Sequence, residues 1–254
     1  MRIDKFLAEK YGSRTKSAEA IEKGLVLVNG KAVSPSYEVK ESDNFEFLQA
    51  EESFVSAGGY KLAKALKDFD FSVKDKIFAD IGASTGGFTD CLLQNGAKKV
   101  YCIDVGESQL DESLKGEKVV IIDNFNARFL NYALFAEELD GVVIDVSFIS
   151  LTYILGAVSA ALRNGNCVLA LIKPQFECES RKVGKNGIVR DEKLHKKIII
   201  KICDFAKSVG LAPRAITNAP IVKGKNMEYV ILLEKGENCE NCANTENLLK
   251  CVKL

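Results

Sequence analysis

Four short apolar segments in the middle of the chain each carry an aspartate at or just before their carboxyl end. They are Ile77–Ile81, Val100–Asp104, Val119–Asp123 and Val142–Asp145. Segments of helical periodicity alternate with such strands, so the chain is predicted to form a mainly parallel, doubly wound sheet of the α/β class. Because ligands of these sheets bind at the carboxyl ends of the strands, the aspartates are expected to line a binding site.

The order of elements divides the chain into four parts. A small module, a linker, the sheet domain and a polar tail are predicted at residues 1–50, 51–60, 61–235 and 236–254, respectively. The linker is expected to be flexible around Ser56-Ala-Gly-Gly59, and an amphipathic helix is expected to begin near Lys61. The tail is polar and carries cysteines, so it is expected to be poorly ordered.

The N-terminal module is predicted to contain two short helices, a hairpin and a third strand. Ser13 is placed to cap the second helix, and Asn29-Gly30 is a strong signal for a type I′ turn. Between Met1 and Ser34 the module has seven basic residues against four acidic ones. This excess suits an ordinary solvated surface or contacts with RNA phosphates. The candidate RNA-contacting residues here are Arg2, Lys5, Arg14, Lys16, Lys23 and Lys31.

The overall composition is that of a soluble protein with balanced charge. The net charge is +0, so any nucleic-acid binding must depend on local patches. No run approaches the ~20 apolar residues of a membrane span, and Met1–Lys5 has no apolar signal-peptide core. A cytoplasmic location, reduced cysteines and no membrane partner are therefore expected. Cys239 and Cys242 have the spacing of half a zinc site without a second pair, so free thiols and no metal are expected.

The stretch Phe78–Phe88 is predicted to form a buried strand, a glycine-rich turn and the start of a helix. Such a turn lets backbone N–H groups approach a ligand closely. A dinucleotide would require Gly-x-Gly-x-x-Gly, and Ser84 stands where the second glycine should be. Asp80 would also repel a pyrophosphate, whereas it suits a cationic, hydroxyl-bearing ligand. S-Adenosyl-L-methionine (AdoMet) is therefore favoured as the cofactor over a nicotinamide dinucleotide.

The candidate contacts to AdoMet come from Asp80, from the turn after it, and from the next two strand ends. The turn is expected to run along the methionine part of AdoMet, through Gly82, Ser84, Thr85 and Gly86. Asp104 is expected to accept hydrogen bonds from the ribose hydroxyls, and Asp123 and Asn126 are expected to lie near the adenine. Helix capping or loop solvation is the alternative role for Asp104 and Asp123.

The kind of atom that accepts the methyl group is inferred from the residue types at the strand ends. Asp145-Val-Ser-Phe148 lacks the amide and prolines of amino-nitrogen methyltransferases, and no Pro-Cys pair offers a thiolate for pyrimidine-carbon methylation. A hydroxyl acceptor remains, and it needs a proton acceptor and in-line placement. Lys173 is the candidate proton acceptor, with a pKa lowered by positive neighbours and partial burial, and Asp145 is placed to orient it. Lys61 and Glu228 complete the set, with surface ion pairing as their alternative role.

Six motifs of this chain resemble those of the TlyA family. They are Ser84–Asp90, Asp104–Gly106, Asn126–Arg128, Asp145–Ser150, Lys173–Glu177 and Asn226–Tyr229. Members of that family are known as hemolysins or as rRNA 2′-O-methyltransferases and have an FtsJ-type catalytic domain. The resemblance, from Met1 to about Glu234, implies a class I, Rossmann-like AdoMet-dependent methyltransferase sheet. The helix pair and the Gly24–Lys31 hairpin resemble the small α+β RNA-binding fold named after ribosomal protein S-four.

The resemblance also implies a site and a substrate. FtsJ-type enzymes use a Lys-Asp-Lys-Glu tetrad, which falls by motif on Lys61, Asp145, Lys173 and Glu228. The implied partner is ribosomal RNA or a ribosomal subunit, and the implied target is a cytidine ribose 2′-hydroxyl. Ala57 departs from the family, whose members often carry arginine there, and this weakens the case for RNA contact by the hinge.

A basic loop follows the last tetrad lysine, and it either forms a solvated charge run or contacts RNA phosphates. Its candidate RNA-contacting residues are Arg181 and Lys182, and Lys185 and Arg190 add to the same charge. His195, on the helix after this loop, is expected at the surface. Two alternatives to an RNA methyltransferase remain: a pore-forming or membrane-active hemolysin, and an RNA-binding protein that uses AdoMet only structurally. The lack of an export signal or membrane span argues against the first, and the complete tetrad argues against the second.

Overall fold

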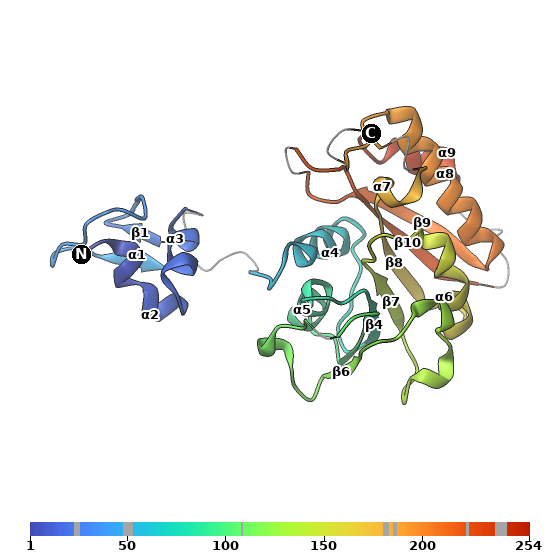
Figure 1. Cartoon of the computed structure of the whole chain (residues 1–254), viewed down its shortest axis with the longest axis horizontal. Helices are drawn as coiled ribbons and strands as arrows, with labels where there is room; N and C mark the ends of the chain where they lie inside the picture. The colour runs from blue at the N-terminus through green and yellow to red at the C-terminus, as the bar shows by residue number, and fades with distance from the viewer. Residues whose placement is uncertain are drawn as a thin grey trace. The chain divides into compact units, whose positions relative to one another are not determined.

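The computed structural model of the chain describes residues 1–22, 26–47, 53–107, 109–179, 183–184, 187–221, 224–236 and 243–254. These residues form two compact units, Met1–Ser53 and Phe54–Leu254 (Figure 1). The division between the units falls inside the linker predicted at residues 51–60.

The smaller unit combines three short helices with a three-stranded antiparallel sheet in the order β2-β1-β3. Its elements are α1 (Ile3–Phe6), α2 (Ala8–Tyr11), α3 (Arg14–Glu22), β1 (Val26–Val28), β2 (Lys31–Ala32) and β3 (Phe45–Phe47). Asn29 and Gly30 have φ angles of 53° and 73°, as a type I′ turn requires, so the predicted hairpin is confirmed. Ser13 Oγ accepts a 3.1 Å hydrogen bond from Lys16 N, which confirms the predicted cap of α3.

The larger unit is built on a seven-stranded sheet in the order β6-β5-β4-β7-β8-β10-β9. The strands are β4 (Ile77–Ile81), β5 (Lys99–Ile103), β6 (Val119–Ile122), β7 (Gly141–Ile144), β8 (Cys167–Ile172), β9 (Leu211–Asn218) and β10 (Tyr229–Lys235). Strands β4 to β8 are parallel, whereas β10 runs antiparallel to both β8 and β9. The predicted mainly parallel sheet is confirmed. The direction of winding reverses between β4 and β7, and ligands of such sheets bind in the crevice at that point.

Helices cover both faces of this sheet (Figure 1). Those of the larger unit are α4 (Ala57–Asp68), α5 (Gly87–Gln94), α6 (Leu155–Ala161), α7 (Pro174–Glu177), α8 (Glu192–Ser208) and α9 (Thr245–Lys250). The described residues also contain four single 3₁₀ turns: η1 (Glu112–Leu114), η2 (Ala127–Phe129), η3 (Tyr132–Leu134) and η4 (Leu151–Tyr153). Helices α4 and α5 bury their apolar side chains with Phe78 of β4, while α6, α8 and α9 pack with Ile77 and Ile81 on the other face. This alternation along β4 is the two-residue period of a strand buried on both sides.

Helix α4 begins at Ala57, earlier than the start predicted near Lys61. The expected flexibility around Ser56–Gly59 was therefore wrong for these residues. A Cβ on Gly59 would lie 2.3 Å from Phe54 Cγ, and a Cβ on Gly87 would lie 3.0 Å from Gly59 N. The glycines thus allow α4 and α5 to approach each other closely. The glycine content of the sequence does not by itself distinguish this packing role from flexibility.

The expectation of a poorly ordered tail was also wrong for residues 243–254. Asn244 caps α9 by accepting a hydrogen bond from Glu246 N, and Leu248 is buried in the core beside α8. Asn218 of β9 exchanges hydrogen bonds of 2.9 and 2.8 Å with the backbone of Lys253. Burial of one leucine contributes about 1.5–3 kcal/mol, enough to hold a short amphipathic helix on a preformed surface.

Candidate active site

The glycine-rich turn after β4 passes close to the backbone that follows β7. Gly82 has a φ of 82°, and its N–H donates a 2.8 Å hydrogen bond to Ile103 O. A Cβ on Gly82 would lie 2.6 Å from Asp145 O, so only glycine fits here. Ser84 also has a positive φ of 48° and, like Thr85, is exposed. The turn therefore brings exposed backbone into the crevice between β4 and β7.

Gly86 lies beneath two side chains that the sequence did not indicate. Its φ is 92°, and it precedes the first residue of α5. A Cβ on Gly86 would lie 2.6 Å from Leu110 Cδ1, and Leu114 also packs there. The segment before and in η1 therefore covers this part of the turn. A contact between Gly86 and a cofactor stays a prediction.

Asp80 lies within β4, fully buried below the turn. Its Oδ2 accepts a 2.7 Å hydrogen bond from Thr89 Oγ1, while its Oδ1 has no hydrogen-bond partner among the described residues. Burial raises the pKa of this carboxyl to about 7, against the opposing effect of the Thr89 hydrogen bond. An unpaired carboxylate oxygen at this place suits a hydrogen-bond donor supplied by a ligand or by water.

We expect Asp80→Asn to gain stability relative to the wild type as the pH rises from about 4 to about 7. The folded protein keeps a proton on Asp80 up to a pKa of about 7, whereas the unfolded chain loses it near 3.8. The wild type therefore loses up to about 4 kcal/mol of stability across this window, and asparagine does not titrate. Urea unfolding at about pH 5.5 and about pH 8 should show the difference between variant and wild type growing by about 2 kcal/mol. The exposed Glu117→Gln is the control, and a constant difference for Asp80→Asn would contradict the expectation.

The next two strand ends carry the other predicted cofactor residues. Asp104 Oδ2 accepts a 2.9 Å hydrogen bond from Ser84 N, and its Oδ1 accepts one of 3.1 Å from Gly106 N. Asp104 thus ties the glycine turn to the loop after β5. Asp123 is half-buried after β6, and Asn126 caps η2 through a 3.1 Å hydrogen bond from Arg128 N. The parallel strands place all of these groups at one edge of the sheet, while their contacts with a cofactor stay predictions.

The four residues of the predicted tetrad form two ion pairs. Lys173 Nζ lies 2.6 Å from Asp145 Oδ1 and donates a 2.8 Å hydrogen bond to Ser147 Oγ. Lys61 Nζ lies 2.6 Å from Glu228 Oε2. The Lys173 and Asp145 side chains are only 11% and 19% exposed, so water screens this pair less than a surface pair. The positive neighbours expected around Lys173 are replaced by a carboxylate and a hydroxyl.

The topology of the sheet explains why these four residues lie at one edge. Asp145 and Lys173 directly follow the parallel neighbours β7 and β8. Glu228 directly precedes β10, and because β10 is antiparallel its start lies beside the end of β8, where Tyr229 pairs with Ile172. Lys61 comes from α4 on the face above, where a Cβ on Gly58 would lie 3.6 Å from Asp145 Oδ2. A lysine–carboxylate group therefore stands next to the glycine turn.

This arrangement agrees with what known proteins show. Residues 54–235 match the family described as FtsJ-like methyltransferase, and residues 1–45 match the S4 domain. The chain belongs to the FtsJ-like methyltransferase family.

Individual relatives of this FtsJ-like protein cover nearly its whole length. Hemolysin A of Brachyspira hyodysenteriae is 44% identical over 236 residues, which span 91% of this chain and 98% of the relative. The 16S/23S rRNA (cytidine-2′-O)-methyltransferase TlyA of Mycobacterium tuberculosis is 35% identical over 225 residues, or 87% of this chain and 84% of the relative. A solved structure of a candidate hemolysin from Lactococcus lactis has a TM-score of 0.73 at 44% identity, covering 78% of this chain and 97% of that one. The resemblance to the TlyA family is confirmed.

Two cavities of the FtsJ-like unit share Gln175, two residues after Lys173. One, of about 720 Å³, is lined by Tyr60, Lys61, Gln175, Pro220, Asn226 and Glu228, among others. The other, of about 970 Å³, includes Arg128, Phe148, Tyr153, Gln175, Phe176 and Lys201. Gln175 Nε2 donates a 3.4 Å hydrogen bond to Glu228 Oε1. The Lys61–Glu228 ion pair thus lines a space large enough for part of a substrate.

Exposed aromatic side chains surround the second cavity. Phe148 is 91% exposed with a φ of 64°, and its ring centroid lies 4.9 Å from that of Phe176. Arg128 lies over the ring of Tyr153, 5.3 Å from its centroid. A positive φ like that of Phe148 costs free energy in a non-glycine residue, and residues with this conformation concentrate at functional sites. Phe148 was noted only as part of a motif in the sequence, and its position beside Asp145 was the available signal.

His195 is buried, and the expectation of a surface position was wrong. Its Nδ1 lies 2.7 Å from Tyr229 Oη and its Nε2 lies 3.0 Å from Val189 O. Both ring nitrogens are therefore satisfied within the fold. The histidine connects α8 to the start of β10, immediately after Glu228, and its partners are too distant in sequence for a local pattern to reveal them.

Five of the six candidate RNA-contacting residues of the S4 unit lie among the described residues, and all five are exposed. They are Arg2, Lys5, Arg14, Lys16 and Lys31. Arg2 and Arg14 also pair with the buried Asp4, at 2.9 and 3.0 Å, and the hydrogen bond from Arg2 lowers the pKa of that carboxyl despite its burial. Part of their hydrogen-bonding capacity therefore serves the fold. Lys23, Arg181 and Lys182 lie outside the described residues.

Two further observations concern membranes and metals. No helix in the described parts of the chain is both long enough and apolar enough to cross a membrane. Within the same residues, no group of three or more His, Cys, Asp or Glu side chains is arranged to hold a metal ion. Cys239 and Cys242 fall outside the described ranges.

Proposed function

We propose that this protein transfers a methyl group from AdoMet to a ribose 2′-hydroxyl of ribosomal RNA, with cytidine as the target. The observation that carries the proposal is the Lys173–Asp145 ion pair, which lies beside the Lys61–Glu228 pair and close to the glycine turn. A hydroxyl acceptor requires such a proton-accepting group near the cofactor. The name of the M. tuberculosis relative supports rRNA and cytidine as substrate and target.

The residues around the crevice fit AdoMet. Two carboxylates, Asp104 and Asp123, follow successive strands and suit the ribose and adenine ends of the ligand. The unpaired Oδ1 of Asp80 and the exposed backbone of Ser84 and Thr85 suit its polar methionine end. When bound, AdoMet supplies a methyl group on a sulfonium, which a hydroxyl oxygen can attack. We propose these residues, with Gly82, Gly86 and Asn126, as the cofactor site.

The two ion pairs of the tetrad would then have different roles in methyl transfer. Lys173 Nζ is the proposed acceptor of the proton of the attacking hydroxyl, and Asp145 holds the amine in place and offsets the charge it gains. Lys61 donates hydrogen bonds to the ribose, and Glu228 orients Lys61 through their 2.6 Å contact. The partial burial of both pairs limits the number of positions their side chains adopt, which favours in-line attack.

RNA would be held by both units of the chain. The S4 unit, with its exposed Lys5, Lys16 and Lys31, is proposed to bind phosphates, and Arg181 and Lys182 are proposed to do the same. The proposed parts are an RNA-binding domain at residues 1–50, a linker that begins at residue 51 and ends before α4, a catalytic domain that includes α4 and continues to residue 235, and a short C-terminal segment at 236–254. Work on ribosomal subunits would place the protein in the cytoplasm.

Phe148→Ala is expected to raise KM for the RNA substrate by about 5- to 100-fold, with a smaller effect on kcat. The exposed ring beside Asp145 offers a face on which a base can stack, and one stacked base contributes about 1–3 kcal/mol. Initial rates over a range of subunit concentrations measure the effect. Ile200→Ala, an exposed apolar residue on α8, is the control. An unchanged KM for Phe148→Ala would remove Phe148 from the proposed RNA surface.

The function itself can be tested with tritiated AdoMet and ribosomal subunits from a strain that lacks this activity. Small and large subunits are labelled separately, and the RNA is digested to nucleosides. Label in 2′-O-methylcytidine supports the proposal. Label in a base, or none in either subunit, would overturn it.

The hypothesis that the protein is a hemolysin is tested separately, because two of the relatives above carry that name. Dye-loaded vesicles of mixed neutral and anionic lipids are exposed to the same protein at the concentrations used for methylation. No release of dye is expected. Release by the wild type that persists in Lys173→Ala would show a membrane activity separate from methyl transfer.

A further inference from the structure

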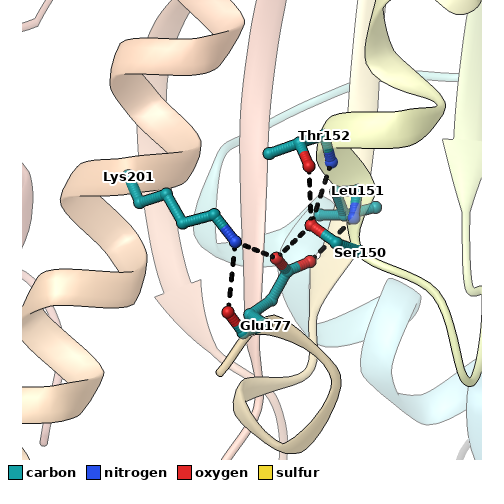
Figure 2. Close-up of polar contacts among 5 residues, drawn as sticks. All are labelled: Ser150, Leu151, Thr152, Glu177 and Lys201. Carbon is teal, nitrogen blue, oxygen red and sulfur yellow. Dashed lines mark hydrogen bonds and ion pairs between the residues drawn. The ribbon is translucent and has the colours of Figure 1, made fainter. Parts of the chain in front are cut away.

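A buried carboxylate, that of Glu177, forms part of the wall of the second cavity. The Glu177 side chain is 2% exposed, and Figure 2 shows it enclosed by Ser150, Leu151 and Lys201. It accepts hydrogen bonds of 2.5 Å from Ser150 Oγ and 2.7 Å from Leu151 N. Lys201 Nζ, from α8, lies 3.3 Å from Glu177 Oε2 and 3.1 Å from its carbonyl oxygen. Burial of this charge is tolerable because each oxygen has a partner and a cation lies close.

The cluster joins the two segments that carry one catalytic ion pair. Ser150 lies five residues after Asp145, and Glu177 lies four residues after Lys173. The segments Asp145–Leu151 and Lys173–Glu177 meet at three successive places: the contacts of Lys173 with Asp145 and Ser147, the contact of the Phe148 and Phe176 rings, and the Glu177 hydrogen bonds. Glu177 therefore closes the end of this connection farthest from the chemistry.

The hydrogen bonds of Glu177 also determine how the first segment ends. Leu151 N is the first N–H of η4, and no residue of a 3₁₀ turn that short can satisfy it from within. Ser150 Oγ donates to Glu177 and accepts a hydrogen bond from Thr152 N (Figure 2). The Glu177 carboxylate thus binds both the Leu151 backbone N–H and the Ser150 side chain at the end of the loop that carries Asp145 and Phe148.

We propose that Glu177 is a positioning residue for methyl transfer. It holds the segment with Asp145 and Phe148 against the segment with Lys173, and so sets the approach of the Lys173 amine to Asp145. It touches neither substrate nor cofactor, and Lys201 offsets its charge. This inference rests on the proposed methyl transfer, because the pair it positions acts in that reaction.

The test compares Glu177→Gln with Glu192→Gln, an exposed glutamate on α8 that serves as the matched control. Glutamine has one acceptor oxygen, which keeps the bond from Leu151 N, and its NH2 group can no longer accept from Ser150 Oγ or from Lys201. Lys201 then keeps only its bond to the backbone carbonyl of residue 177, and the Ser150 hydroxyl must turn to accept instead of donate. The single-turnover rate at saturating AdoMet and subunits is expected to fall by about 10- to 100-fold, as a displacement near 1 Å produces. AdoMet affinity is expected to stay within about twofold, since the cofactor turn does not contact Glu177.

Ser150 supplies a second variant that leaves the buried charge paired. Ser150→Ala is expected to slow the reaction by a smaller factor, and Ser150→Thr, which keeps the hydroxyl, is expected to restore the rate. The double variant with Glu177→Gln should be less than additive, because the two residues act through one hydrogen bond. This set keeps the inference testable if Glu177→Gln does not fold.

Three results would overturn the inference. The first is a lower melting temperature for Glu177→Gln with an unchanged rate per folded molecule, which would make Glu177 a stabilising residue only. The second is equal slowing by Ser150→Ala and Ser150→Thr. The third is a wild type that labels no ribose, which would overturn the proposed function and this inference together. The first two results, obtained beside an active wild type, would remove the inference alone.

Discussion

Replacing Lys173 by alanine is expected to lower kcat for methyl transfer to ribosomal subunits by about 10²- to 10⁴-fold, the usual contribution of a positioned proton acceptor. Lys173 Nζ is held 2.6 Å from Asp145 Oδ1 and donates to Ser147 Oγ, at the end of a buried strand. No other described lysine makes an ion pair with Asp145. The alanine variant therefore loses the proton acceptor while the cofactor turn stays in place. AdoMet binding, measured by calorimetry, should be nearly unchanged.

Two controls separate this loss from a general effect of removing a lysine. Lys98→Ala removes an exposed lysine just before β5, at the opposite edge of the sheet, and is expected to keep full activity. Lys173→Arg keeps the positive charge but is not expected to restore the rate, because a guanidinium stays protonated and cannot accept a proton. Retention of more than about a tenth of wild-type kcat by Lys173→Ala would exclude the assigned role, given the magnitude expected for a proton acceptor.

Gly82→Ala is expected to abolish most AdoMet binding and to lower the melting temperature by about 4–10 °C. The alanine would adopt a φ of 82°, which costs about 1 kcal/mol, and its Cβ would in addition lie 2.6 Å from Asp145 O. Neither strand end can move freely, because β4 and β7 are hydrogen-bonded neighbours. The overlap must therefore shift either the cofactor turn or the backbone of Asp145. Both AdoMet affinity and kcat should fall, the affinity by at least about tenfold.

Gly165→Ala distinguishes backbone strain from overlap. Gly165 has a φ of 88°, close to that of Gly82, but no atom lies within 4 Å of the Cβ position. This variant should lose about 2–4 °C in melting temperature, as expected for about 1 kcal/mol of strain, and should bind AdoMet normally. Equal losses of AdoMet affinity in both variants would mean that the close approach of Gly82 to Asp145 has no part in cofactor binding.

Much of the sheet could be predicted because its signals are local. The apolar run Ile77–Ile81 is β4 without a change of boundary, and the run Val142–Asp145 differs from β7 by one residue at each end. Such runs specify a strand buried on both faces, and the turn residues beside them mark its ends. The glycine turn was predictable for the same reason, since its positive φ angles depend on neighbouring residues. Helix α9 was missed because a short helix is stable only through the surface on which it packs.

The sequence alone determined the family, the order of strands and helices along the chain, and the residue types at the strand ends, including Gly82 in the turn after β4. Only the tertiary structure decided which of those residues meet. An antiparallel β10 places the start of one strand beside the end of another, which brings Glu228 to the edge that holds Lys173. Burial decided the roles of Glu177 and His195, which look like ordinary surface residues along the chain. The physical reason is that their partners lie far away in sequence, so that only packing brings the charges and hydrogen-bonding groups together.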